Sequence, residues 1–267
     1  MNAFHNFFHL SLLSLVRDRL LHVIGCLSLL LFLVIPSFSM FSMRQVQELS
    51  ISLSLSSISF ILLLITLLAG SSSIWRDVEK RYTASVLTLP ISRISFVLGK
   101  FCAVAAVIAS AAMLMTVFSW LVISISASKY PSAIPVNWML FVTVVFSDVL
   151  KYMLLLAFSF LFSAVSTSFF FPFFVSIALY LAGSASQEVY EFIGGEYSRT
   201  IPVFSKYMVQ GLYYIIPNFG AFNLKVYAIY GLQLSPYMVF MTLLYGACYT
   251  GIVLWLAAWG FSRREIT

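Results

Sequence analysis

Six long apolar runs, separated by shorter polar stretches, dominate the pattern of the chain. A helix needs about 20 apolar residues to cross the hydrocarbon core of a bilayer, and most of the runs reach that length. The predicted crossings are residues 20–40, 51–73, 101–127, 138–162, 169–183 and 236–260. Because a helix satisfies its own backbone hydrogen bonds in lipid, the pattern predicts an all-α membrane protein with six transmembrane helices, organised as one transmembrane domain over residues 1–267.

Two further segments have patterns typical of the membrane–water interface. In residues 1–19, apolar side chains such as Phe4, Phe8 and Leu12 recur at helical spacing, which predicts a helix lying in the headgroup plane. This segment lacks the charged start and cleavage site of a secretory signal, so we expect no processing. Residues 184–235 are rich in Tyr, Gly and Pro, which favours an outer interfacial or re-entrant segment before the last helix.

The composition agrees with a chain whose main solvent is lipid. Only 9% of the 267 residues are charged, 61% are hydrophobic and the mean hydropathy is +1.00, whereas about a quarter of a soluble domain is charged. This excludes a soluble enzyme, a disordered protein and a secreted disulfide scaffold. Cys26, Cys102 and Cys248 lie far apart within apolar runs, so they indicate small apolar fillers rather than a disulfide framework or a metal site.

The basic residues predict the orientation. Cytoplasmic loops carry an excess of Lys and Arg, so the net charge of +6 indicates membrane topology rather than nucleic acid binding. With the N-terminus inside, the inner side holds Arg17, Arg19, Arg76, Lys80, Arg81, Arg93, Lys100, Arg263 and Arg264, and the outer side holds Arg44, Lys129, Arg199, Lys206 and Lys225. The inner loops are short and densely charged, and we therefore expect both termini to be cytoplasmic.

The most charged stretch, residues 75–100, follows the second predicted crossing. One apolar stripe at steps of three and four consists of Trp75, Val78, Tyr82, Val86 and Leu89. Asp77 precedes Lys80 and Arg81 by three and four residues, so ion pairs can form along the polar face, and Pro90 ends the helix. The pattern predicts a cytoplasmic amphipathic helix to which a soluble partner can bind. Charge and amphipathicity alone would also fit an ordinary cytoplasmic loop.

The order of residues in this stretch resembles a known family. The shared marks are the acidic pair Asp77 and Glu79, the basic pair Lys80 and Arg81, Leu87, Pro90-Ile91-Ser92-Arg93 and Phe96-Val97-Leu98-Gly99-Lys100. They resemble the first cytoplasmic loop of type-two ABC transporter permeases, with the group associated with multi-copper-enzyme maturation as the nearest. The match covers about 25 residues, and Tyr82 stands where the family usually has Thr, with Thr83 one place later.

The resemblance implies a membrane subunit that pairs with a second copy, as a homodimer, and whose loop docks on a separate ABC ATPase. It assigns the ATPase-coupling role to Arg76, Asp77, Glu79, Lys80, Arg81, Tyr82, Pro90, Ser92, Arg93, Gly99 and Lys100. The chain has no phosphate-binding loop of the type Gly-x-x-x-x-Gly-Lys-Ser/Thr, so ATP and Mg would bind to the partner and this chain would be non-catalytic with no cofactor of its own. The expected location is the inner membrane of a prokaryote.

One pair of charges interrupts the fourth apolar run. Asp148 and Lys151 lie three apart on one helix face, and ionisable groups at membrane depth are usually functional or paired with each other. They would form a polar contact or gate on an export path, or they would lie at the outer interface where the true crossing begins after a horizontal helix. The length of the run favours the second interpretation.

Three functions therefore stay open, and the first is favoured. The chain would be the permease subunit of an ATP-driven exporter of an amphipathic or small substrate, with lipid around it and an outer accessory protein as a further candidate partner. The alternatives are an ATP-independent transporter or channel built on Asp148 and Lys151, or a mechanical scaffold driven by an ABC ATPase. Two groups of possible metal ligands are better explained as polar helix faces than as metal sites: the pair His5 and His9, and the acidic residues Glu188, Glu191 and Glu196.

Overall fold

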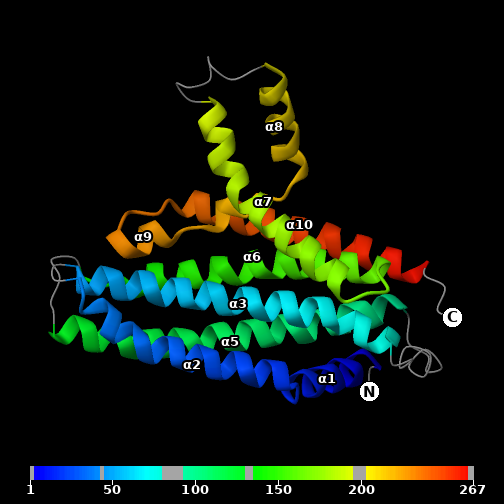
Figure 1. The fold of residues 1–267 in the computed structure, drawn as a ribbon, viewed down its shortest axis with the longest axis horizontal. Coiled ribbons are helices and arrows are strands. Elements are labelled where there is room, and N and C mark those ends of the chain that lie inside the picture. The colour runs from blue at the N-terminus through cyan, green and yellow to red at the C-terminus, as the bar shows by residue number, and fades with distance from the viewer. Residues whose placement is uncertain (1–2, 43–44, 80–92, 130–134, 195–202, 264–267) are drawn as a thin grey trace.

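The computed structural model describes residues 3–42, 45–79, 93–129, 135–194 and 203–263 (Figure 1). These residues form helices and no strand, and six of the helices are long and apolar enough to cross a membrane, as predicted. The six are α2 (Arg19–Ser39), α3 (Val46–Glu79), α5 (Arg93–Lys129), α6 (Trp138–Val165), α7 (Phe170–Gly194) and α10 (Pro236–Ser262). The shorter elements are α1 (Ala3–Val16), α8 (Val203–Ile215), the 3-10 turn η2 (Gly220–Phe222) and α9 (Lys225–Tyr230).

The long helices form a bundle with α6 at its centre. Helix α6 packs against α3, α5, α7 and α10, and most of its side chains are buried. The outward faces of the other helices carry large exposed apolar side chains, for example Leu33 on α2, Met113 on α5 and Trp255 on α10. Such faces suit contact with lipid tails, because in lipid an exposed apolar side chain costs nothing.

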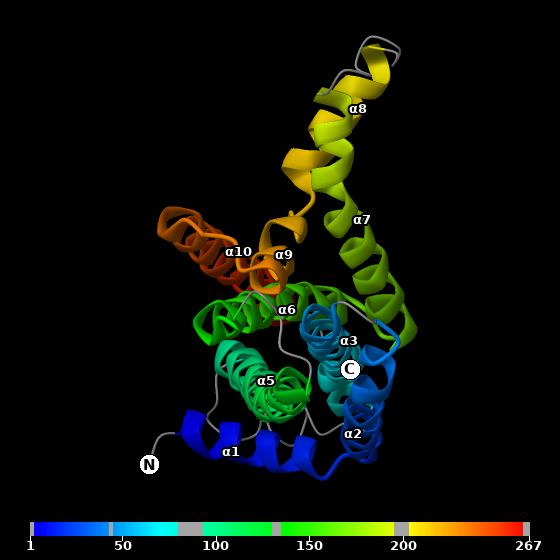
Figure 2. The same ribbon diagram turned by 90° about the vertical axis from the view of Figure 1, so that its left-hand side faces the viewer.

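The two ends of the bundle differ. At one end, which we call the loop end, α3 ends and α5 begins, and both the N-terminal helix α1 and the last turn of α10 lie there (Figure 1). We call the opposite end the far end. Figure 2 looks along the bundle from the far end and shows α1 lengthwise beside α5, which it packs against. Helix α1 therefore lies across the bundle, as expected for a segment in the plane of the headgroups.

Two helices continue past the predicted crossings at the loop end. Helix α3 has 34 residues and extends to Glu79, so Arg76, Asp77 and Glu79 belong to the last turns of a long helix. Helix α5 has 37 residues and begins at Arg93, so Gly99 and Lys100 lie within it. No proline interrupts either stretch, which explains why each helix continues from the apolar run into the charged segment.

The prediction of a separate horizontal helix before Asp148 is wrong. Helix α6 is continuous over 28 residues from Trp138, where Asn137 caps it by accepting a hydrogen bond from the Leu140 amide, to Val165. Nothing in its sequence breaks the helix, since it contains neither Pro nor Gly. Asp148 and Lys151 therefore lie near the middle of a single long helix.

The fifth long helix is longer than expected and includes the first residues of the predicted outer segment. Helix α7 does not stop at residue 183 but continues to Gly194, because the intervening residues include no strong helix breaker. Its second half leaves the bundle and pairs with α8 in a helical hairpin, which projects from the side of the bundle (Figure 1). The chain then returns as residues 219–230, which contain η2 and α9 and pack onto α3, α6 and α7. We call residues 219–230 the docked segment.

Candidate functional site

The predicted coupling residues fall into two groups. Arg76, Asp77 and Glu79 lie in the last turns of α3, and Arg93, Gly99 and Lys100 lie in the first turns of α5. The remainder, Lys80, Arg81, Tyr82, Pro90 and Ser92, lie outside the described residues. The structure therefore describes the two helical ends that flank the predicted coupling segment, and the contacts of these ends show how that segment is joined to the bundle.

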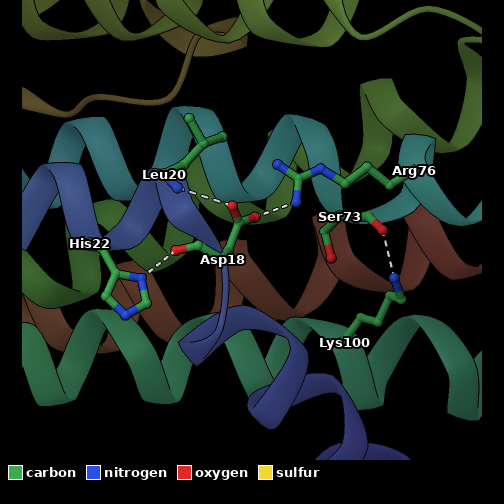
Figure 3. A network of polar contacts seen from close by, with 6 residues as sticks. All are labelled: Asp18, Leu20, His22, Ser73, Arg76 and Lys100. Atoms are coloured by element: carbon green, nitrogen blue, oxygen red, sulfur yellow. Dashed lines mark hydrogen bonds and ion pairs between the residues drawn. The ribbon is translucent and has the colours of Figure 1, made fainter.

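An ion pair joins the end of α3 to the start of α2 (Figure 3). The Nη1 group of Arg76 donates to Oδ2 of Asp18, and the other carboxylate oxygen of Asp18 accepts from the Leu20 amide at 3.0 Å, which caps α2. His22 Nδ1 donates to the Asp18 carbonyl at 2.8 Å. Asp18 thus holds the Arg76 guanidinium of α3 beside the N-terminus of α2.

A second contact joins α3 to α5. The Lys100 ammonium is buried and donates to the carbonyl oxygen of Ser73 at 2.5 Å, and it also lies 5.4 Å from the centre of the Phe96 ring (Figure 3). Ser73 lies six residues before the end of α3, and a carbonyl oxygen has two lone pairs, so it can accept from Lys100 in addition to its helical hydrogen bond.

Aromatic rings and one further hydrogen bond extend the contact to α1 and α10. The Phe96 ring lies 5.1 Å from the Phe7 ring of α1 and stacks on the Phe261 ring of α10 at 5.5 Å. Arg93 Nη1 donates to the Ser262 carbonyl at 3.0 Å. Five helices, α1, α2, α3, α5 and α10, are therefore tied together at the loop end, and we call these contacts the loop-end network.

Sequence reasoning missed Asp18 as a member of this network. The residue stands directly before an apolar run, which is the signature of a helix N-cap, so its capping role was readable from the sequence. Its ion pair with Arg76 was not, because the two residues are 58 positions apart and belong to different helices.

The second candidate group, Asp148 and Lys151, is a buried ion pair. Their charged atoms are 2.5 Å apart, and the side chains are 1% and 6% exposed. Lys151 also contacts Ser59 Oγ on α3 at 3.4 Å, and Ser59 Oγ shares a hydrogen bond of 2.8 Å with the Tyr152 hydroxyl. The pair therefore links α6 to α3 inside the bundle, far from the loop-end network along the helix.

The remaining candidates show no assembled site within the residues that the structure describes. No group of three His, Cys, Asp or Glu side chains is close enough there to hold a metal ion. The cysteines at 26, 102 and 248 are free and exposed rather than packed inside the bundle. His5, His9, Glu188 and Glu191 are exposed, while Glu196 lies outside the described ranges.

Six long apolar helices pack around a buried core and expose large apolar side chains on their outer faces. These features define an integral membrane protein. The chain belongs to the ABC-2 family transporter proteins, whose family model matches residues 8–190, more than half of its length. No curated protein matches the chain. The matched residues include the predicted coupling segment and the Asp148–Lys151 pair, and they end within α7.

Membership of this family gives the general role. The chain is a permease-type membrane component of an ABC transporter, a class of subunit that is generally non-catalytic and works with ABC ATPase subunits.

Proposed function

We propose that this chain is the membrane-spanning subunit of an ATP-driven exporter, and that its loop end is the docking site of a separate ATPase. One observation carries the proposal most strongly. Helix α3 continues without a break from the core of the bundle to Glu79, and its last turns are tied to α2 by Arg76 and to α5 by Lys100. A partner that moves the segment after Glu79 would move three helices together.

In this proposal the coupling residues have two roles. Those nearest the partner, which make contact with the ATPase, are Asp77, Glu79, Lys80, Arg81, Tyr82, Pro90 and Ser92. Arg76, Arg93, Gly99 and Lys100 anchor the flanking helices. ATP and Mg would bind to the partner, and closure of two ATPases would shift two copies of this chain between alternate packings of the bundle.

The finer assignments follow the same reasoning. The excess of basic residues at the loop end supports a cytoplasmic position for that end and for both termini, in the inner membrane of a prokaryote. The order of residues around Pro90 supports the group associated with multi-copper-enzyme maturation. The substrate would be amphipathic or small, with an outer accessory protein as a candidate receiver.

A purified complex tests the proposal. The chain is expressed together with candidate ABC ATPase subunits, and the variant Glu79→Ala/Arg81→Ala is compared with Glu188→Ala/Arg199→Ala, which removes the same residue types from the outer segment. We expect the first variant to lose the co-purifying ATPase, or its stimulation in proteoliposomes, with an unchanged melting temperature. The control should keep both. If no ATPase subunit binds the chain, or if the first variant behaves as the control, the proposal fails.

A second candidate function rests on the buried pair in α6. Asp148 and Lys151 lie near the middle of a long apolar helix, where ionisable groups commonly mark the path of a proton or substrate. An ATP-independent transporter built on them would work in liposomes that contain this chain alone, driven by a proton gradient. Proton-coupled flux without any ATPase would favour this function over the first.

A further inference from the structure

The turn between α1 and α2 carries two exposed arginines, and we call it the basic elbow. Arg17 follows α1, and Arg19 is the first residue of α2. Asp18 lies between them, but its carboxylate already binds Arg76 and the Leu20 amide (Figure 3). Within the residues that the structure describes, neither Arg17 nor Arg19 forms an ion pair or a side-chain hydrogen bond. The basic elbow therefore presents two positive charges that this part of the chain does not neutralise.

From the basic elbow, an exposed apolar stripe runs along α2, which lies at the edge of the bundle (Figure 2). Val23, Cys26, Leu30 and Leu33 follow Arg19 at steps of four, three, four and three residues, so they share its helix face. All are exposed, and Leu33 reaches 78%, whereas the opposite face of α2 packs into the bundle. The stripe is about 21 Å long at about 1.5 Å per residue, which exceeds the hydrocarbon layer of one leaflet, about 15 Å.

Helix α1 places the basic elbow at the depth of lipid headgroups. The Arg17 amide donates to the Leu13 carbonyl at 3.2 Å, so Arg17 continues the last turn of α1. Leu10 and Leu13 are exposed on the same face as Arg17, at 64% and 38%. Because α1 lies across the bundle and α2 runs along it, the arginines lie where the two directions meet. Arginines at such a place keep their charge among the headgroups while apolar neighbours contact the acyl chains.

We propose that the basic elbow and the α2 stripe bind an anionic phospholipid, with the headgroup at Arg17 and Arg19 and an acyl chain along Val23 to Leu33. Charge and polarity together select this occupant. A soluble acidic partner would match the arginines but leave the stripe uncovered. A second copy packed symmetrically on the stripe would bring two further arginines beside the first two, and like charges repel. The inference goes beyond the proposed coupling function and does not depend on it.

The native cysteines provide a reporter of the bound acyl chain. Cys26 lies on the stripe and Cys248 lies exposed on α10, so each is kept alone while the other two cysteines are replaced by Ser. The full chain is labelled with a small fluorophore and placed in nanodiscs of phosphatidylcholine. Quenching is then measured as brominated phosphatidylglycerol, or brominated phosphatidylcholine, replaces part of that lipid.

We expect the label at Cys26 to be half quenched by about 25-fold less brominated phosphatidylglycerol than brominated phosphatidylcholine, because each arginine near a membrane surface contributes about a fivefold preference for anionic lipid. The label at Cys248 should respond to the two lipids alike. Equal quenching at Cys26 by the two lipids overturns the proposal.

Variants assign the preference to the arginines. Arg17→Gln/Arg19→Gln should abolish it at an unchanged melting temperature, since both side chains are exposed, and Arg17→Lys/Arg19→Lys should keep it because the charges remain. The matched control Arg199→Gln/Lys206→Gln removes the same charge from the outer segment and should change nothing. A preference that survives the first variant, or that is lost in the lysine variant, overturns the proposal.

Two further arms distinguish the other occupants. Inorganic phosphate in the buffer should not reduce the preference at Cys26, and a preference that it abolishes would assign the basic elbow to a free anion. If neither lipid quenches the label at Cys26 and oxidation of the unlabelled protein joins two chains through Cys26, a second copy covers the stripe and the proposal fails. The assay contains no ATPase, so its outcome is independent of the coupling experiment.

Discussion

The loop-end network and the buried pair of Asp148 and Lys151 both join helices through charge, but they do so in different surroundings. Arg76 and Asp18 have side chains that are 36% and 14% exposed, whereas Asp148 is 1% exposed. A charge that water can reach loses little when its partner moves away, and a charge inside the bundle loses much. Breaking the ion pair at the loop end should therefore cost less than breaking the buried pair of Asp148 and Lys151.

The largest expected effect follows from removing one buried charge. Asp148→Leu should lower the free energy of unfolding by about 3 kcal/mol, because it leaves Lys151 buried in α6 without its counter-charge. The double variant Asp148→Leu/Lys151→Leu should recover most of the loss. Unfolding in detergent micelles measures both values. A double variant that is as unstable as the single one would show that the charges are not what holds α6 and α3 together.

A pair of glycines separates packing from charge at the docked segment. A Cβ on Gly183 of α7 would lie 2.3 Å from the Pro217 carbonyl oxygen and 2.6 Å from the Phe219 ring of the docked segment, whereas nothing lies within 4 Å of one on Gly211 of α8. Gly183→Ala should therefore lower the free energy of unfolding in detergent micelles by about 2 kcal/mol, while Gly211→Ala should be neutral or stabilise α8 by up to about 1 kcal/mol. Equal stability of the two variants would mean that the docked segment does not rest on α7.

The sequence predicted the helices well because their signal is local. Each apolar run needed only its own length to be identified, and the all-α fold with six long helices is confirmed. The error at α6 arose because two charges were taken as the start of the membrane, whereas in the structure each charge satisfies the other inside the bundle. Hydropathy assigns a cost to each residue separately and does not include that pairing.

The contacts of the candidate sites could not be predicted to the same extent. The spacing within α6 placed Asp148 and Lys151 on one face, but the hydrogen bond from the neighbouring Ser147 to the Phe222 carbonyl depends on how a distant segment returns to the bundle. Asp18 and Arg76 likewise belong to different helices, and their pairing depends on tertiary packing.

A double-mutant cycle tests the partly exposed ion pair between Asp18 and Arg76. Asp18→Asn, Arg76→Gln and the double variant should each change the free energy of unfolding by no more than about 1 kcal/mol, because the pair is partly exposed. If the ATPase acts through α3, the same variants should reduce ATPase stimulation in the complex several-fold. A loss of stability as large as that of Asp148→Leu would contradict the distinction between the two clusters.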